Sequence, residues 1–345
     1  MKRIDRPYYD NRPNTSKRMK VKDHGIVYHH GDGPGDCDKY GAREASVFQN
    51  NGTYYLFVDG AGPTGWLACQ SRSNDLVNWQ KMGAALDLGD AGEMDSASAS
   101  SPWVYRENGK WHMFYLGTPN AGPAPELVPA FPYVSMKAWA TDPEGPWIKD
   151  KENVPFVAPK GSYYQDTSSP GFVIKHNGEY LMYFSAAVEE DRKSDTGRFA
   201  VRGLGIARTT DLEGPWTPDP EPVIPQEEQV ENSSVFYEEE TGTWYLFTNH
   251  IGIEDDPENG VVEYTDAIWV YWSKDPNNWD PANKAVVIDG HNCSWSNRCI
   301  GMPSVIRKDD RLAILYDAPE GDSIDANYRN IGLAWADLPL KFVED

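Results

Sequence analysis

Short apolar runs separated by polar turns recur along most of the chain, and they come in pairs. The run 45–49 (ASVFQ) precedes Asn-Asn-Gly and then 53–59 (TYYLFVD). The same pairing returns at 102–106 with 110–116, and at 171–175 with 179–185. Asn and Gly tolerate positive φ, so these turns predict β-hairpins. Few stretches are left in which a long helix could form.

The hairpins belong to a larger repeat. Further hairpins are predicted at 231–250 and 303–317, and a third apolar run follows each hairpin, at 66–72, 133–140, 203–209, 267–273 and 331–338. Four of these runs lead into a turn that begins near an Asp and closes on a tryptophan. The closing tryptophans, Trp79, Trp147, Trp216 and Trp279, are 68, 69 and 63 residues apart.

Five copies of a three- or four-stranded antiparallel unit predict an all-β fold. We expect a five-bladed β-propeller, with its antiparallel blades around a central site. A double β-sandwich is the alternative, and the regular repeat argues against it. Residues 1–23 are polar and basic and are expected to form an N-terminal arm, with 24–345 as a single propeller domain. The segment 24–29 (HGIVYH) could be a strand that completes the last blade.

Three insertions fall between second and third strands, at 117–132, 186–202 and 250–266. Loops at matching places in each blade gather on one face of a propeller, which is usually the binding face. We therefore expect these loops to surround a site. Long insertions on one face also favour a closed pocket over an open groove.

Charge and composition narrow the partners. The formal net charge of −21 disfavours nucleic acid and anionic membranes, because both require clustered Lys and Arg. No 18-residue apolar run and no apolar N-terminal signal segment occur, so we expect a cytoplasmic protein, or a secreted or periplasmic one if a leader has been removed. The 13 Trp and 19 Tyr suit strands and also stack on sugar rings.

Motifs for other chemistries are absent from the sequence. The four cysteines, at 37, 69, 293 and 299, form no CxxC pair, which disfavours zinc. No HExxH, P-loop, GxSxG or GxGxxG motif appears, so metalloprotease, nucleotide-binding and serine-hydrolase functions have no support. We expect no cofactor and no required metal.

The residues at the start of each first strand carry the candidate chemistry. They read AREASVF, ASASSPWV, QDTSSPGFV, VENSSVF and CIGMPSVI, and small side chains dominate because innermost strands converge on the axis. A carboxylate in such a place is costly unless it is used or paired. Three of the five starts have one: Glu44, Asp166 and Glu231. Asp38 and Asp95 lie slightly further upstream of two starts.

These features together resemble the five-bladed β-propeller glycoside hydrolases, the superfamily of families 43, 32, 62 and 117. The shared motifs are 43–48 (REASVF), 52–57 (GTYYLF), 75–79 (DLVNW), Asp166 and Glu231. At the level of architecture, the resemblance covers residues 40–338. It implies a propeller that cleaves glycosidic bonds with paired carboxylates.

The resemblance also implies roles. Glu44 would be the base, where most relatives have Asp, Asp166 would hold the sugar and tune the proton donor, and Glu231 would be the general acid. Asp166 lies slightly out of register, so Asp95 is the alternative candidate for its role. Asp38 is the alternative candidate for the base. Glycoside cleavage needs one protonated and one ionised carboxyl group, about 6.5–9.5 Å apart if the reaction inverts. Inversion is the expected outcome.

Each acid also has an ordinary structural explanation. Glu44 could form a salt bridge with Arg43, Asp166 could cap nearby backbone, and Glu231 could be a surface acid at a strand edge. Further candidates for contacts with the sugar are polar or aromatic residues near the strand starts or loops. They are Arg43, Asp95, Ser101, Trp103, Ser169, Asn232, His250, Trp269, Trp295 and Arg298.

The expected function is that of an exo-acting glycoside hydrolase on plant or algal oligosaccharides. Arabinofuranosidase- or xylosidase-like activity is the first choice, and galactosidase- or anhydrogalactosidase-like activity is the second. A non-catalytic propeller that binds glycan or protein is the alternative. A glycoside phosphorylase ranks last, because it needs a basic phosphate pocket and the strand starts supply only Arg43 and Arg298.

Overall fold

Antiparallel β-strands make up nearly all regular structure in the computed structural model, which describes residues 15–152, 154–190, 199–256 and 260–344. In this part of the chain, helical structure is limited to two single 3₁₀ turns, η1 (Pro34–Asp36) and η2 (Gln226–Glu228). The all-β prediction is therefore confirmed.

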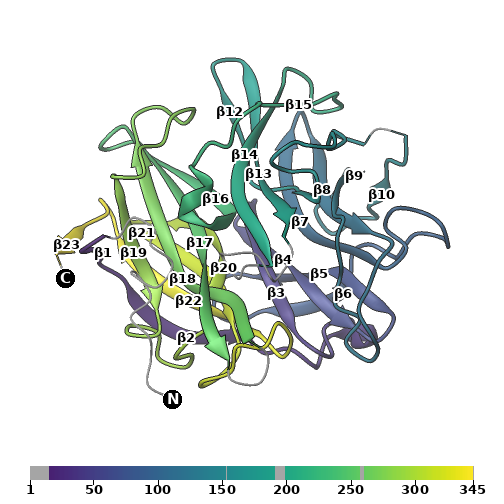
Figure 1. The fold of residues 1–345 in the computed structure, drawn as a ribbon, viewed down its shortest axis with the longest axis horizontal. Coiled ribbons are helices and arrows are strands. Elements are labelled where there is room, and N and C mark those ends of the chain that lie inside the picture. Colours follow the sequence, from purple (N-terminus) through teal and green to yellow (C-terminus); the bar gives the residue numbers. More distant parts are fainter. Residues whose placement is uncertain (1–14, 153, 191–198, 257–259, 345) are drawn as a thin grey trace.

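The described strands are hydrogen-bonded into four sheets, of six, eight, five and four strands (Figure 1). A parallel pair between β5 and β7 joins two successive antiparallel groups into the eight-stranded sheet, so the chain passes through five such groups, here called units. The first two units are β3 (Ala42–Asn50), β4 (Thr53–Gly62), β5 (Gly65–Ser73) and β6 (Gln80–Ala84), then β7 (Ser98–Glu107), β8 (Lys110–Thr118), β9 (Val134–Ala140) and β10 (Ile148–Lys149). The third is β11 (Thr167–Ser169), β12 (Val173–His176), β13 (Glu179–Glu189), β14 (Ala200–Thr209) and β15 (Thr217–Pro218). The last two are β16 (Val230–Glu238), β17 (Thr243–Asp256), β18 (Gly260–Ser273) and β19 (Lys284–Asp289), then β20 (Gly301–Lys308), β21 (Arg311–Ala318) and β22 (Asn330–Asp337).

The hairpin turns have the predicted geometry. In the first three units the Asn-Gly pair of the turn has positive φ at both residues, for example 50° at Asn51 and 85° at Gly52. This conformation matches the right-handed twist of the flanking strands, which explains why Asn-Gly recurs there.

The repeated tryptophans join neighbouring units. Trp147 packs edge-on against Phe57 of the preceding unit, with ring centroids 5.8 Å apart. Trp216 meets Phe114 in the same way at 5.3 Å, and Trp279 meets Tyr183 at 6.3 Å. The period of about 68 residues in the sequence therefore corresponds to one contact between successive units.

Strands of successive units also contact one another in order. β3 contacts β7, β7 contacts β12, β13 contacts β16, and β16 contacts β20. β20 in turn contacts β3, so the last unit meets the first. In Figure 1 the colours run around the molecule accordingly, from purple β3 through blue and teal to green and yellow.

Both chain ends add strands to the last two units. β2 (Lys22–Tyr28) pairs antiparallel with β22, so the segment 24–29 does complete the fifth unit. β1 (Lys17–Met19) pairs with β19 and with β23 (Phe342–Glu344). Part of the stretch expected to be an arm is thus in strands, while residues 1–14 lie outside the described residues.

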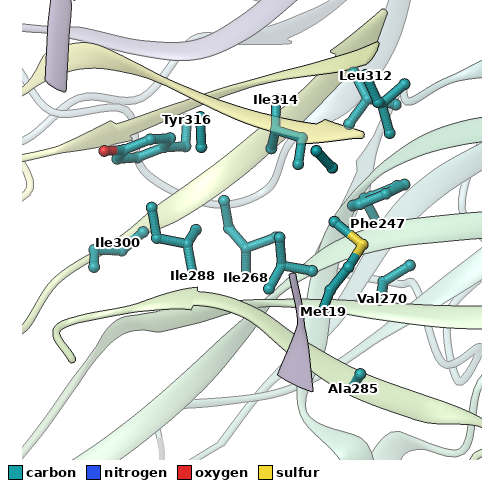
Figure 2. Packing of buried hydrophobic residues seen from close by; sticks show 14 of the residues in the cluster. Met19, Phe247, Ile268, Val270, Ala285, Ile288, Ile300, Leu312, Ile314 and Tyr316 are labelled. Atoms are coloured by element: carbon teal, nitrogen blue, oxygen red, sulfur yellow. The ribbon is translucent and has the colours of Figure 1, made fainter. Parts of the chain in front are cut away.

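The largest apolar cluster lies between the fourth and fifth units. Figure 2 shows Met19 of β1 beside Phe247 and Val270 of the fourth unit, facing Leu312 and Ile314 of the fifth. Met19 is 2% exposed. The short strand β1 therefore contributes directly to the core.

One predicted loop is wrong in large part. The segment 250–266 was expected to be an insertion, but β17 and β18 continue through it as paired strands up to Asp256 and Gly260. Ile251, Ile253 and Tyr264 are buried there, because the alternating apolar residues of this acidic stretch face inward.

Candidate active site

A cavity of about 200 Å³ lies where the first strands of the units begin. Its walls come from the first strands of all five units, which are β3, β7, β11, β16 and β20. The other walls are parts of β4, β5, β8, β13 and β14, and the insertions before β9 and β14. The polar residues that line it are Arg43, Glu44, Asp59, Ser100, Ser101, Tyr133, Thr167, Ser169, Ser185, Arg202, Glu231 and Asn232.

A repeated β-bulge points side chains into this cavity. The pairing register shifts near the start of β3, β7, β16 and β20, and each shift contains one non-glycine residue with φ between 47° and 56°. These residues are Glu44, Ser101, Asn232 and Met302, and all four line the cavity. Such left-handed backbone costs on the order of 1–3 kcal/mol per residue, and it is found mainly at functional sites.

Glu44 is held by hydrogen bonds from three units. Its Oε2 accepts hydrogen bonds from Ser101 Oγ at 2.6 Å and from Asn232 Nδ2 at 3.2 Å. Its backbone N–H donates to Asp317 Oδ2 at 2.8 Å, and Arg329 Nη1 donates to the other oxygen of Asp317 at 2.6 Å. Both the carboxyl group and the strained backbone of Glu44 are therefore fixed.

Burial raises the pKa of Glu44. The Arg43 guanidinium and the Ser101 hydroxyl oppose this rise, whereas the carboxyl groups of Asp317 and Glu231 add to it. A carboxyl group that is buried among charged neighbours in a cavity is typical of a catalytic acid or base.

Asp59, on β4, lies behind Glu44 and is buried. Its Oδ2 is 3.1 Å from Ser101 Oγ, and its Oδ1 accepts a hydrogen bond from the Ser101 backbone N–H. Burial, and then the charge of Glu44, raise the pKa of Asp59 well above its ordinary value.

Glu231 lies in the same cavity and is paired with Arg202. The distance from Arg202 Nε to Glu231 Oε2 is 3.1 Å, and the same guanidinium also binds the carboxylate of Glu263 on β18. Burial opposes the charge of Arg202, but the two glutamates outweigh it, and the pKa of Arg202 is raised.

Aromatic side chains cover the cavity. Phe131 from the insertion before β9 stacks on Phe199 from the insertion before β14, with centroids 5.5 Å apart and rings 17° from parallel. Trp66 at the start of β5 lies under the Arg43 guanidinium, 5.4 Å from the ring centroid, and donates Nε1–H to Glu126 O at 2.8 Å. Two of the predicted insertions therefore do gather over one site.

The structure brings six of the sequence-predicted site residues together. Glu44, Glu231, Arg43, Ser101, Ser169 and Asn232 all line the cavity. They come from four separate units of the chain, at the strand starts at which the sequence placed them.

Asp166 does not line the cavity, although its neighbours Thr167 and Ser169 do. Its Oδ2 instead accepts hydrogen bonds from Gln165 Nε2 at 3.1 Å and from the Glu189 backbone N–H at 2.9 Å. The expected role of Asp166 in holding the sugar is not supported by this position. The carboxylate therefore has a structural role, but it holds the backbone of Glu189 on β13 and not the adjacent Thr167–Ser168 backbone.

Neither reserve acid reaches the cavity. Asp38 is fully buried and is bound by Tyr28 Oη, the Gly33 N–H and Lys81. Asp95 is bound by Tyr115 Oη at 2.9 Å and by Lys149 at 2.5 Å. Both acids therefore have structural roles.

The remaining candidates also lie outside the cavity lining. Trp103 packs on Phe172, and Trp295 stacks on Tyr316 and donates to its hydroxyl. Trp269 is 2% exposed.

The other two candidates, His250 and Arg298, are engaged by carboxyl groups. His250 Nδ1 is 2.6 Å from Asp266 Oδ1, and Arg298 pairs with Glu254. These five residues thus take part in packing and polar contacts away from the cavity.

Sequence reasoning missed Asp59, Trp66, Arg202 and the stacked pair Phe131 and Phe199, which we call the roof of the cavity. Asp59 and Trp66 belong to second and third strands, whose inner ends also reach the axis. Arg202 and Phe199 stand at the end of the insertion 186–202, which the sequence places around the site without singling out any of its residues. The available signal was position in the repeat, because each of these residues lies at the end of its unit at which the first strand begins.

Among the described residues, no group of His, Cys, Asp or Glu side chains is arranged to hold a metal ion. In the same part of the chain, no helix has the length and apolar character needed to cross a membrane.

Comparison with known proteins gives one family match at the sequence level. The model described as the glycosyl hydrolases family 32 N-terminal domain matches residues 47–199. No curated protein matches the chain.

Solved structures match over nearly the whole chain. A thermostable family-43 glycoside hydrolase is 18% identical, with 88% of this chain and 91% of that chain covered and a TM-score of 0.62. A family 117 glycoside hydrolase from the marine bacterium Zobellia galactanivorans is 17% identical, with coverages of 91% and 90% and a TM-score of 0.59. The catalytic domain of a GH62 α-L-arabinofuranosidase from Coprinopsis cinerea is 11% identical, with coverages of 93% and 98% and a TM-score of 0.61.

At these identities the structural matches establish the fold. Together with the family 32 match, they confirm the resemblance to the propeller glycoside hydrolases of families 43, 32, 62 and 117.

Proposed function

We propose that this chain is a five-bladed β-propeller glycoside hydrolase that removes single sugars from the ends of oligosaccharides. Both kinds of comparison support an O-glycosyl hydrolase. The observation that carries the proposal is the convergence of Glu44 and Glu231, from the first and fourth units, in one roofed cavity. The cycle of contacts between strands of successive units supports the ring of five blades.

Hydrolysis needs a proton donor and a base on opposite sides of the sugar. In our proposal Glu231 donates a proton to the glycosidic oxygen as that bond breaks. Glu44 removes a proton from the water that attacks the anomeric carbon. The products are a sugar of inverted configuration and the shortened chain, with one water consumed.

The size and roof of the cavity support exo-action. Pockets for drug-sized ligands span about 300–1,000 Å³, whereas this cavity has about 200 Å³ beneath Phe131 and Phe199. A space of this size suits one sugar ring. Trp66 and Phe131 offer apolar ring faces, and Arg43, Ser169 and Asn232 offer hydrogen-bond donors for hydroxyl groups.

The similarity to a GH62 α-L-arabinofuranosidase makes arabino-oligosaccharides the first substrates to test. Xylo-, galacto- and agaro-oligosaccharides follow. Wild type, Glu231→Gln and Glu44→Gln should be compared on this panel, with and without phosphate, by chromatography of released sugar. The anomer first formed should be read by NMR.

We expect wild type to release a monosaccharide without phosphate and each variant to lose at least a hundredfold in kcat. Release that depends on phosphate would instead indicate a phosphorylase, although Arg202 beside Glu231 is already shared between two glutamates. Binding of the same sugars without release, by a folded protein, would favour the non-catalytic propeller.

A further inference from the structure

The hydroxyl group of Ser101 lies between two carboxyl groups. Its Oγ is 2.6 Å from Glu44 Oε2 and 3.1 Å from Asp59 Oδ2, and both contacts have hydrogen-bond geometry. A hydroxyl group has one proton, so it can donate to only one of the two oxygens. The other contact needs a proton on a carboxyl group.

The remaining contacts indicate which carboxyl group holds this proton. Glu44 Oε2 accepts from Asn232 Nδ2 as well, so two donors converge on this one oxygen, which is the pattern of a carboxylate. Asp59 Oδ1 accepts from the Ser101 backbone N–H, which leaves its Oδ2 to face the hydroxyl oxygen. A neutral carboxylic acid has one accepting and one donating oxygen, and Asp59 fits that pattern.

The surroundings of the two acids agree with this assignment. Both acids line the cavity, but Asp59 is only 2% exposed, whereas Glu44 is less deeply buried and lies next to the Arg43 guanidinium. Two ionised carboxylates on one hydroxyl would repel each other, and the more deeply buried one is the less costly to neutralise.

We propose that Asp59 is a positioning residue that stays protonated, donates to Ser101 Oγ and so directs the Ser101 hydroxyl to Glu44. The inference rests on the proposed function, in which Glu44 must be the ionised base. It explains why a buried aspartate stands on the second strand of the first unit. The proton on Asp59 does not take part in the reaction, and only the hydrogen-bond direction matters.

Two substitutions of Asp59 separate this role from others. Asp59→Asn keeps one acceptor and one donor in nearly the same shape, while Asp59→Ala removes both. We expect Asp59→Asn to keep kcat/KM within about threefold and the acidic limb of its pH profile within about 0.3 pH unit. We expect Asp59→Ala to lose at least tenfold and to shift that limb to higher pH, as Ser101→Ala also should.

The direction in which the acidic limb of the pH profile shifts in Asp59→Asn decides whether Asp59 is protonated or ionised. If Asp59 were ionised while Glu44 titrates, Asp59→Asn would remove a negative charge and lower the limb by about one unit. That result would overturn the proposal, as would wild-type behaviour of Asp59→Ala. If Asp59→Ala does not fold, the position of the limb in Asp59→Asn alone decides.

A stability measurement tests the same proton without any substrate. If the pKa of Asp59 is higher in the folded than in the unfolded state, the folded protein holds a proton that the unfolded chain releases. Stability then falls as pH rises above the unfolded value of about 4. Other groups contribute with the opposite sign in this range, since burial lowers the pKa of His112 to about 4. We therefore expect the urea midpoint of wild type to fall with pH relative to that of Asp59→Asn. Equal slopes would overturn the proposal, and because no sugar is involved, this outcome is distinct from a failure of the proposed hydrolase function.

Discussion

At the residue scale, the site depends on where single charges are placed. Glu44 and Glu231 come from first strands that are far apart in sequence, and each has its own charged or hydrogen-bonding partner. The bulge residues Glu44, Ser101 and Asn232 share left-handed backbone, which turns their side chains into one cavity. The candidate site is thus built around a β-bulge that recurs near the starts of β3, β7 and β16.

Arg202 offers a test at this scale. Its guanidinium joins Glu231 to Glu263, and its side chain is 12% exposed. Arg202→Gln should lower kcat at least tenfold, because Glu231 loses the group that orients it. It should also cost about 3 kcal/mol of unfolding free energy, the lower end for breaking a buried ion pair.

Arg208 is the matched control, since it lies on the same strand, β14, and pairs with Asp219 nearer the surface. Arg208→Gln should keep kcat and lose no more than about 1 kcal/mol in urea unfolding. Equal effects of the two substitutions on kcat would contradict the role given to Arg202.

At the element scale, the insertions and the extended strands contribute different residues to the site. The insertion before β9 supplies Phe131 and Tyr133, and it is tied down by Trp66 through Glu126. The segment 250–266, which reads as another loop, instead extends a hairpin so that Glu263 reaches Arg202. The roof and the long hairpin thus support the cavity from different sides.

The roof can be tested by removing one ring. Phe131→Ala should raise KM about tenfold, which corresponds to about 1.4 kcal/mol of binding, and change kcat only a few-fold. The physical reason is that Phe131 and Phe199 line the cavity with apolar rings and have no group that can transfer a proton. Steady-state kinetics on the substrate found in the panel would measure this.

Phe172→Ala removes a ring of the same size outside the cavity, where Phe172 packs on Trp103. It should lower stability and leave KM unchanged. A rise in KM for both variants would mean that the effect of Phe131 is one of general stability.

At the scale of the whole molecule, the units are held together in the same way from one to the next. Trp147, Trp216 and Trp279 each pack on an aromatic residue of the preceding unit. The chain ends strengthen the last two units, where β2 pairs with β22 and β1 lies between β19 and β23.

Met19 tests whether β1 matters for the whole fold. It is 2% exposed and lies in the cluster between the fourth and fifth units (Figure 2). Met19→Ala should cost about 2–5 kcal/mol in urea unfolding, through lost burial and the cavity that remains. Lys20→Ala, at the exposed neighbouring position, should change stability by less than about 0.5 kcal/mol. Similar values for the two would contradict a structural role for β1.

The sequence by itself determined the local structure and its repetition. Asn-Gly turns, alternating apolar residues and evenly spaced tryptophans fix hairpins because they depend on neighbours close in the chain. The same logic placed Glu44, Glu231, Ser101 and Asn232 at corresponding strand starts, and the structure brings them together.

Only the tertiary structure decided which polar residues serve the site. Asp166, Asp95 and Asp38 resemble Glu44 in sequence, but each carboxyl group is bound by groups outside the cavity. Asp59 and Arg202 have no local signature, because their partners Ser101 and Glu231 come from other units. Burial and long-range hydrogen bonds set the protonation and direction of these groups, and neither can be seen in a sequence read one segment at a time.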